Sequence, residues 1–251
     1  MMLTGQVALV TGAGRGIGRA VAEALLDQGA HVMGCGRGAR PEDLPEAINW
    51  TVCDVSDSAR VEELFSETAR QIGPVSILVN NAGVQIEKTL ADSSDQDWDQ
   101  VIGTNCRGVF NCCRAAISQA PEQGLRIVNI GSISGNVADS GMALYNASKA
   151  FVHGLTRSIA ADHGPRVRCN AIAPGWIMTD MADAAFAVAD DPVKAQADAL
   201  ARHPAGRFGQ PGDIAGMVVW LVSDQAEFVT GQVFTVDGGL TAVSPLRPEL
   251  G

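Results

Sequence analysis

The stretch QVALVTGAGRGIGRAVAEALLDQG, residues 6–29, joins an apolar run to an amphipathic pattern through a glycine-rich turn. The run QVALVTG predicts a buried strand, and the apolar residues of GIGRAVAEALLDQG recur at helical spacing up to Gly29, which suits a helix C-cap. The glycines of TGAGRGIG (residues 11–18) allow a tight turn and a close approach to a pyrophosphate, and Gly16 to Gly18 open a helix whose free N–H groups favour anionic oxygens. Such a string also occurs in ordinary strand-to-helix turns. This one has the preceding strand and following helix that a dinucleotide-binding turn requires.

The alternation of strand and helix continues along the chain. Further strands are predicted at AHVMGCG (30–36), INWTVCDV (48–55), VSILVNNAG (75–83), RIVNIGS (126–132), VRCNAIAPG (167–175) and QVFTVDGG (232–239). Further helices are predicted at residues 59–73, 95–120, 145–164 and 211–224. Val- and Ile-rich strands between helices predict an α/β fold: a Rossmann-like doubly wound parallel sheet in three α/β/α layers, with residues 1–251 forming a single domain.

Composition narrows the class of partner. The 251 residues carry a formal net charge of −10, and 46% of them are hydrophobic, which is ample for a large core. This acidity opposes binding to nucleic acid or to an anionic membrane surface, because both need basic patches, and no apolar run is long enough to span a bilayer. A small-molecule substrate is therefore expected.

Six cysteines and four histidines show no metal-ligand or paired-disulfide spacing, so we expect no metal and read the cysteines as reduced core residues. The first predicted strand begins almost at the N-terminus and leaves no room for a signal peptide, which favours a cytoplasmic location.

The end of the second predicted strand bears on the choice of cofactor. A carboxylate there would accept the ribose 2′-hydroxyl of NAD, but the chain reads Cys35-Gly36-Arg37, and Arg15 lies in the glycine-rich turn. Two guanidinium groups suit a 2′-phosphate, so NADP(H) is favoured and NAD(H) stays possible; both arginines could instead be solvated surface charges. Asp54, at the end of the third strand, could accept from the adenine amino group or cap the following helix.

Ser132, Tyr145 and Lys149 lie within one short stretch, SISGNVADSGMALYNASK. Tyr145 and Lys149 are four residues apart, so on a helix they share a face, where an ammonium can favour the phenolate. A free tyrosine titrates near pH 10, so proton transfer at neutral pH needs such a cation. Each residue also has an ordinary structural interpretation, and the joint spacing with the glycine-rich turn favours the catalytic one.

On these motifs the chain resembles the single-domain short-chain dehydrogenases/reductases of about 250 residues. TGAGRGIG is similar to the family's TGxxxGxG turn, Asn80-Asn81-Ala82-Gly83 to its NNAG element, and Ser132 with Tyr145-x-x-x-Lys149 to its catalytic site. Asn105 matches the asparagine that completes the tetrad, and Pro174-Gly175 with Thr179 matches the segment that holds the nicotinamide carboxamide.

The resemblance implies a role for each matched residue. Tyr145 would exchange a proton with the substrate oxygen, Ser132 would donate to that oxygen, Lys149 would bond the nicotinamide ribose, and Asn105 would anchor a water relay. Asn81 would tie neighbouring strands together. The residues implied in cofactor binding are Gly12, Gly14, Arg15, Gly16, Ile17, Gly18, Arg37, Asp54, Val55, Asn81, Ala82, Gly83, Tyr145, Lys149, Pro174, Gly175, Ile177 and Thr179. The family also implies a homotetramer, and the tail after Gly239 is long enough to reach a neighbouring subunit.

Substrate choice is expected to depend on three segments: Val84 to Thr89, Ser134 to Met142, and an irregular stretch at about 176–210 that we predict to be a helical lid. Their side chains form a mixed lining that suits a neutral, mid-sized ketone or secondary alcohol better than an anionic one. The candidates are Val84, Gln85, Ile86, Asn136, Val137, Asp139, Met142, Trp176, Met181 and Phe186.

The predicted reaction is the NADP(H)-dependent interconversion of a secondary alcohol and a ketone. One alternative is a 3-oxoacyl-[acyl-carrier-protein] reductase. Two features count against it: the acidic chain would repel an acidic carrier protein, and the segment between Thr179 and Pro204 is longer than is usual in those reductases. A second alternative is a dinucleotide-binding sensor or scaffold without catalysis. The presence of both Tyr145 and Lys149 counts against it.

Overall fold

In the computed structural model, which describes residues 1–180, 182 and 191–243, the predicted strands form one parallel sheet. Its order is β3-β2-β1-β4-β5-β6-β7. The strands are β1 (Val7–Thr11), β2 (His31–Gly36), β3 (Ile48–Val52), β4 (Ile77–Asn80), β5 (Leu125–Ile130), β6 (Val167–Pro174) and β7 (Val233–Val236). The chain passes from β3 over the sheet to β4, and the β1–β3 half meets the β4–β7 half at the crossover point where β1 pairs with β4, so the doubly wound parallel fold is confirmed.

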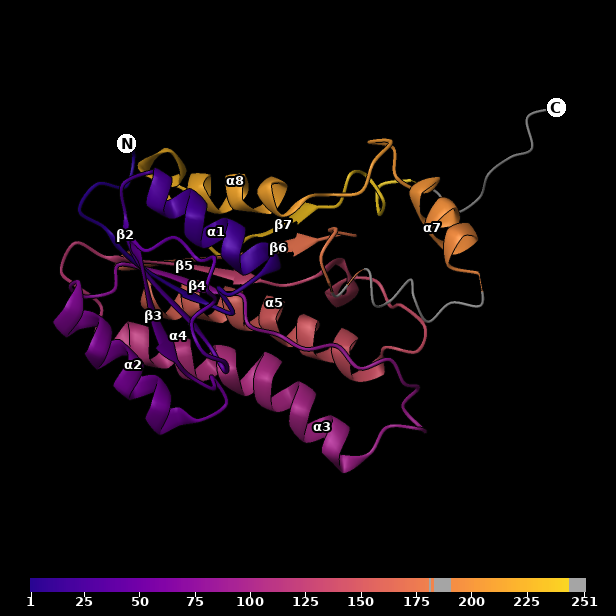
Figure 1. The fold of residues 1–251 in the computed structure, drawn as a ribbon, viewed down its shortest axis with the longest axis horizontal. Coiled ribbons are helices and arrows are strands. Elements are labelled where there is room, and N and C mark those ends of the chain that lie inside the picture. Colours follow the sequence, from indigo (N-terminus) through magenta and orange to yellow (C-terminus); the bar gives the residue numbers. More distant parts are fainter. Residues whose placement is uncertain (181, 183–190, 244–251) are drawn as a thin grey trace.

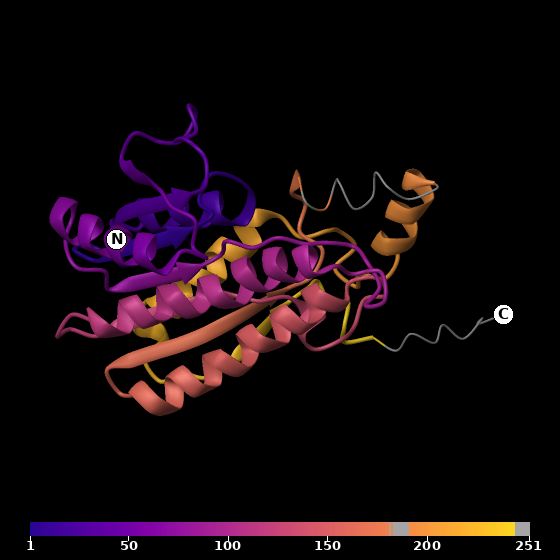
Figure 2. The same ribbon diagram turned by 90° about the horizontal axis from the view of Figure 1, so that it is seen from below.

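Helices cover both faces of this sheet (Figure 1). One face carries α1 (Gly16–Asp27) and α8 (Pro211–Val222), which pack against each other. The other carries α2 (Ser58–Gln71), α3 (Asp95–Ile102), α4 (Val109–Ser118) and α5 (Ala143–His163). Seen from below in Figure 2, the α3–α4 helix and α5 run side by side across that face.

The core lies in two layers because side chains alternate along each strand. Ala8 and Val10 of β1 pack on the α1/α8 side, whereas Leu9 between them packs on the α2/α4/α5 side. All six cysteines are buried free thiols, as expected from the sequence. None of the helices in the described part of the chain is long and apolar enough to cross a membrane.

One segment differs in detail from the sequence-based prediction, and another contains a helix as expected. The single helix expected over residues 95–120 is interrupted by a π-helical turn, Gly103–Gly108, between α3 and α4. The irregular stretch at 176–210 contains the helix α7 (Pro192–Leu200), capped by the side chain of Asp191, which accepts from Lys194 N. Met181, Phe186 and the last residues of the tail, 244–251, lie outside the described residues.

Candidate active site

A cavity of about 590 Å³ opens at the carboxyl ends of the central strands, next to the crossover between β1 and β4. Every predicted site residue lines it except Gly18 and Asn105. Its lining also includes five of the predicted substrate-side residues: Val84, Gln85, Asp139, Met142 and Trp176. Ile86, Asn136 and Val137 are not part of the lining, and their contribution to substrate choice stays a prediction.

The glycine-rich turn between β1 and α1 needs glycine at particular positions. Gly12 and Gly16 have φ angles of 65° and 55°, in the left-handed region that favours glycine. A Cβ at Gly18 would lie 2.2 Å from the carbonyl oxygen of Gly12, which explains a glycine that supports the cavity without lining it. The N-cap of α1, Arg15, makes no side-chain cap, so the first N–H groups of the helix are free. This arrangement fits a pyrophosphate.

Asn81 holds this turn to the neighbouring strand. Its Nδ2 donates to the carbonyl oxygens of Thr11 (3.0 Å) and Gly12 (3.1 Å), and its backbone N–H donates to Thr11 Oγ1 (3.0 Å). The predicted strand-tying role of Asn81 is therefore confirmed, and it links β1 to β4 at the crossover.

At the other end of the cavity, the carboxylate of Asp54 bonds a residue of its own turn. Its Oδ1 accepts from the backbone N–H (2.9 Å) and the hydroxyl (2.7 Å) of Ser56. The N-cap of α2 is Asp57, whose side chain accepts from Ala59 N and Arg60 N. The alternative that Asp54 caps the helix is therefore wrong, because the turn after β3 places Asp57 at the helix start.

Sequence reasoning missed Trp50, which lines the same end of the cavity. The indole packs so closely on the adjacent backbone that a Cβ at Gly34 or Gly36 would lie 3.1 to 3.2 Å from its ring carbons. Its Nε1 donates to the carbonyl oxygen of Gly38 at 3.2 Å. The sequence feature that could have indicated this packing is the pair Gly34 and Gly36, two residues apart in a buried strand, because glycines on one face of a strand make space for a large ring on the next strand.

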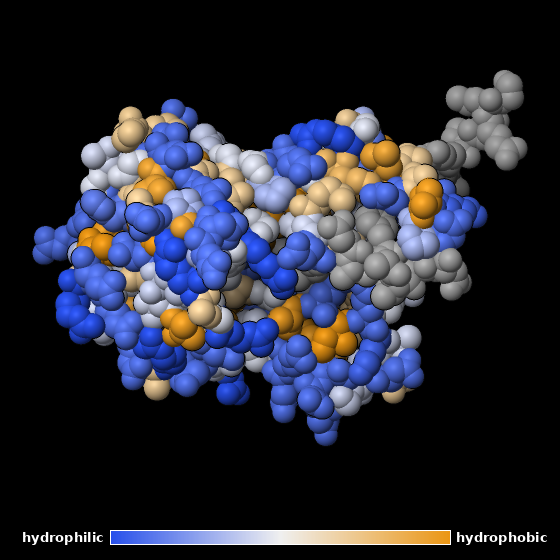
Figure 3. Space-filling model, viewed as in Figure 1, coloured by the Kyte–Doolittle hydropathy of each residue, from blue (hydrophilic) through white to orange (hydrophobic). Residues whose placement is uncertain are grey.

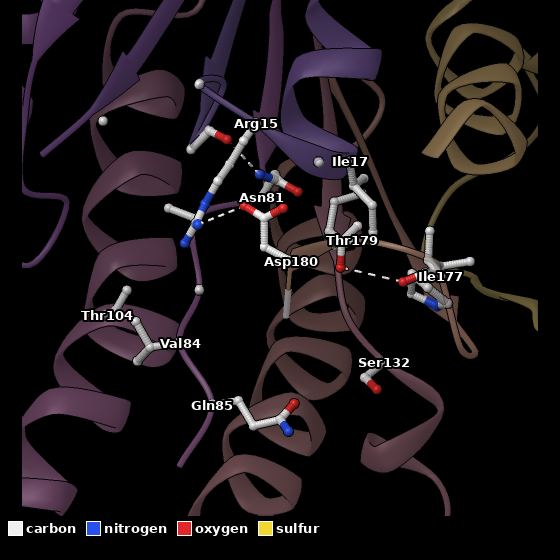
Figure 4. A pocket seen from close by; sticks show the side chains of 18 of the residues that line it. Arg15, Ile17, Asn81, Val84, Gln85, Thr104, Ser132, Ile177, Thr179 and Asp180 are labelled. Atoms are coloured by element: carbon white, nitrogen blue, oxygen red, sulfur yellow. Dashed lines mark hydrogen bonds and ion pairs between the residues drawn. The ribbon is translucent and has the colours of Figure 1, made fainter. Parts of the chain in front are cut away.

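The two arginines predicted to meet a 2′-phosphate differ in their surroundings. Arg15 reaches across the cavity and forms an ion pair with Asp180 at 2.8 Å, as Figure 4 shows. Arg37 is exposed and lines the cavity, with no ion pair among the described residues. Both guanidinium groups therefore face the cavity, but a phosphate at Arg15 would compete with the carboxylate of Asp180.

Tyr145 lies in the first turn of α5, and Lys149 follows one turn later. Lys149 Nζ lies 5.4 Å from the centre of the Tyr145 ring and donates to the carbonyl oxygen of Ile130 at 3.0 Å. Burial raises the pKa of the Tyr145 phenol to about 12, although the Ser132 side chain lowers it. Burial also lowers the pKa of Lys149 to about 8. The phenol is therefore protonated at neutral pH.

Ser132 lies directly after β5, in front of a 3₁₀ turn at Ile133–Gly135. Its hydroxyl donates to Ser134 Oγ at 3.1 Å, and Ser134 Oγ donates to the carboxylate of Asp139 at 2.8 Å. Both serines are buried, so the strand end holds the Ser132 oxygen in place on the wall that also carries Tyr145.

Asn105 lies inside the π-helical turn and is almost completely buried. Its side-chain oxygen accepts from Val84 N (2.8 Å), and its Nδ2 donates to Val84 O (2.9 Å) and Ser148 Oγ (3.0 Å). A Cβ at Gly83 would lie 3.4 Å from Asn105 Oδ1 and 3.7 Å from Lys149 Nζ. Asn105 thus fixes the cavity wall beside Lys149.

His153 is a further residue that the sequence did not single out. It lies one turn after Lys149 on α5, and a Cβ at Gly131 or Gly135 would come within 2.6 Å of its ring. Its Nδ1 lies 3.1 Å from Asn136 Oδ1, so the imidazole packs into the loop that carries Ser132. The signal was the pair of glycines on either side of Ser132, which make room for a ring.

Comparison with known proteins assigns the family. A family model described as "Enoyl-(Acyl carrier protein) reductase" matches residues 12–241. The chain belongs to the short-chain dehydrogenase/reductase family, in agreement with the motifs above. It is an NAD(P)-dependent oxidoreductase that acts on CH–OH groups and interconverts a secondary alcohol and a ketone.

Similar proteins carry two kinds of name. The chain is 41% identical over 244 residues to the 3-oxoacyl-[acyl-carrier-protein] reductase FabG of Staphylococcus aureus, covering 93% of this chain and 97% of that protein. It is 38% identical to the Escherichia coli protein of the same name, covering 97% of this chain and 100% of that protein. The solved structure of Thermoplasma acidophilum aldohexose dehydrogenase is similar with a TM-score of 0.91 and 33% identity, covering 98% of each chain.

Proposed function

We propose that the protein uses NADP(H) to interconvert a neutral secondary alcohol and its ketone, with Tyr145 as the general acid and base. The observation that carries this proposal is that Ser132, Tyr145 and Lys149 line one cavity whose other end is the glycine-rich turn. One cavity therefore offers a proton donor beside a cradle for a dinucleotide.

The residues divide the work as follows. Gly12, Gly14, Gly16 and Asn81 would hold the pyrophosphate, and Pro174, Gly175, Ile177 and Thr179 would hold the nicotinamide end. The bound dinucleotide supplies or accepts the hydride. Tyr145 would give its proton to the ketone oxygen in reduction and take it back in oxidation, and Ser132 would stabilise the charge on that oxygen.

Lys149 would hold the nicotinamide ribose and favour the phenolate electrostatically. Its ammonium lies over the ring of Tyr145, which supports this role. Both polar atoms of the Asn105 side chain bond Val84 or Ser148, so we propose that it positions the wall beside Lys149. Its part in a water relay stays a prediction.

The preference for NADP(H) is supported by the absence of a carboxylate at the end of β2 and by the exposed guanidinium of Arg37 in the cavity lining. Arg15 would add a second contact if it leaves Asp180. A planar guanidinium binds phosphate oxygens in pairs, whereas it gains little from a ribose hydroxyl.

The deciding experiment compares the wild type with Tyr145→Phe in NADPH-dependent reduction of a panel of ketones. We expect kcat/KM to fall by about 10²- to 10⁴-fold, because the substitution removes the proton donor but keeps the ring. NADPH binding, followed by fluorescence titration, should be retained. Unchanged turnover would refute the role of Tyr145, and binding without turnover of any substrate would favour the sensor alternative.

A second candidate, 3-oxoacyl-[acyl-carrier-protein] reductase, is supported by the names of the relatives described above. The polar lining with Gln85, Ser134 and Asp139, and the net charge of −10, favour a small neutral substrate instead. A parallel assay with a 3-oxoacyl thioester, free and attached to carrier protein, and with neutral cyclic ketones and polyols decides between them. Higher kcat/KM for the thioester would establish the second candidate.

We also propose that the protein is a homotetramer that works in the cytoplasm, with residues 176–210 acting as a substrate lid. The large exposed side chains of Trp98, Phe110 and Phe151 on α3, α4 and α5 support assembly through these helices. Six free thiols support a reducing compartment. The lid is supported by Trp176, Ile177, Thr179, Asp180 and Ala182, which line the cavity.

A further inference from the structure

Three side chains form a hydrogen-bonded chain that leads from the exposed Asp139 to Ser132, which interacts with the proposed proton donor. Asp139 Oδ2 accepts from Ser134 Oγ at 2.8 Å, and Ser134 Oγ accepts from Ser132 Oγ at 3.1 Å. Asn146 Nδ2 donates to the backbone oxygen of Asp139 at 2.9 Å, which fastens the start of the chain to the helix that carries Tyr145. All three chain members line the cavity.

The direction of hydrogen bonding in this chain is forced by its acidic end. An ionised carboxylate can only accept, so Ser134 must give its single hydroxyl hydrogen to Asp139. The hydroxyl of Ser134 can then only accept from Ser132, which leaves the oxygen of Ser132 without a hydrogen to offer elsewhere. The backbone N–H of Ser134 also donates to Ser132 Oγ at 3.1 Å, so that oxygen is held as an acceptor from other groups.

This direction opposes ionisation of the phenol. A phenolate is stabilised when Ser132 donates to it, and interaction with Ser132 lowers the pKa of Tyr145. The charge of Asp139 acts in the opposite sense and raises that pKa. The other titratable groups around the phenol are Lys149, whose Nζ lies 5.4 Å from the centre of the ring, and the groups that interact with Lys149, His153 and Cys106.

We propose that Asp139 is a positioning residue that acts through Ser134: it draws the hydroxyl hydrogen of Ser132 away from Tyr145 and so keeps the phenol ready to give a proton. The inference rests on the proposed function for the claim that this proton goes to the substrate, but the titration of the phenol can be measured without it. The proposal implies that the free site is set for ketone reduction and that substrate binding must turn the Ser132 hydroxyl towards the reacting oxygen.

The test uses the fact that Tyr145 is the only tyrosine in the chain. Isotope labelling of the tyrosine Cζ carbon therefore gives one resonance, whose shift with pH reports this phenol directly and needs no substrate. We expect Asp139→Asn and Ser134→Ala each to move the titration to lower pH by about 0.5 unit, because the first removes the charge and the second frees the hydrogen of Ser132. The shift in the double variant should be smaller than the sum of the two single-variant shifts, because both substitutions act on the same hydrogen-bonded chain.

Glu122→Gln is the matched control, because it removes one exposed negative charge in the loop after α4 and should leave the titration unchanged. A shift in Asp139→Asn with none in Ser134→Ala would overturn the proposal, since the carboxylate would then act across space alone. No shift in either variant would overturn it as well. The fall of kcat/KM for reduction at alkaline pH should move by the same amount. If the titration shifts are observed but neither the wild type nor any variant turns over a substrate, the proposed function alone is refuted.

Discussion

Arg15 and Arg37 illustrate how far a residue's role depends on its partner. Both guanidinium groups line the cavity, but Arg15 is paired with Asp180 across the cavity, whereas Arg37 has no such partner in the described part of the chain. A phosphate that binds Arg15 therefore competes with a carboxylate for the guanidinium, whereas a phosphate that binds Arg37 meets no such competitor among the described residues. The two arginines are expected to contribute unequally to cofactor choice.

Asp180→Asn should tighten NADPH binding while leaving NADH binding unchanged. The pair is exposed at both ends, with side-chain exposures of 81% and 71%, so the competing interaction is weak and the gain should be only about twofold to fivefold. Fluorescence titration of both cofactors measures it. Equal tightening of NADH would mean that Asp180 acts on a part that both cofactors share.

Arg37→Asp should have the larger and opposite effect. Loss of a charge-assisted contact and gain of a repelling carboxylate should weaken NADPH binding by about tenfold or more and improve NADH binding. Arg70→Gln, which removes an exposed arginine at the far end of α2, is the control. An unaltered NADPH affinity in Arg37→Asp would count against the NADP(H) preference.

Helix α5 organises the candidate site because three of its residues recur at one-turn intervals. Tyr145, Lys149 and His153 lie four residues apart, and His153 packs against the glycines on both sides of Ser132. The imidazole therefore joins the helix to the loop, and its burial should make the fold sensitive to acid.

His153 gives a prediction for stability against pH. Burial, Lys149 and Arg157 lower its pKa from 6.5 to about 4. Between these values the unfolded chain binds a proton that the folded chain does not, so stability should fall as pH drops from 6.5 and level off near 4, a loss of about 3 kcal/mol. Urea unfolding at neutral and mildly acidic pH measures this loss.

His153→Gln should remove most of that acid sensitivity, whatever its effect on stability at neutral pH. His163→Gln, at the exposed end of the same helix, should keep it. If His153→Gln is as sensitive as the wild type, another group is responsible for the loss.

Element positions were largely predictable from the sequence, whereas local distortions were not. Gly29, with a φ of 90°, follows α1 where the C-cap was expected. The π-helical turn around Asn105 was missed because it keeps the apolar periodicity of the helix nearly intact while shifting its hydrogen bonds. Such a turn is stabilised by contacts to Val84 and Ser148, which the local sequence does not encode.

The assembled molecule leaves large apolar side chains on the face made by α3, α4 and α5. Trp98, Phe110 and Phe151 are 53%, 43% and 41% exposed. The face viewed in Figure 3 is mostly hydrophilic, with separate hydrophobic patches. Burying these three aromatic residues in a subunit interface would remove them from water, which is the physical basis of the proposed tetramer.

Phe151→Glu should break that interface, because it would place a charge where the apolar surface is buried. Sedimentation velocity should show the wild type as a tetramer and the variant as smaller species. Val52→Glu, at an exposed position of the edge strand β3, should leave the assembly intact. A monomeric wild type would refute the tetramer.

The positions of the strands and helices along the chain, the glycine-rich turn and the pair Tyr145-x-x-x-Lys149 could all be predicted from the sequence, because hydrophobic periodicity and short spacings are local properties. The pairing of Arg15 with Asp180, which is 165 residues away, the packing of Trp50 over Gly34 and Gly36, and the chain from Asp139 to Ser132 emerged only from the folded molecule. The crossover between β1 and β4 brings distant loops to one edge of the sheet, and the partner that each polar side chain takes there depends on packing in three dimensions.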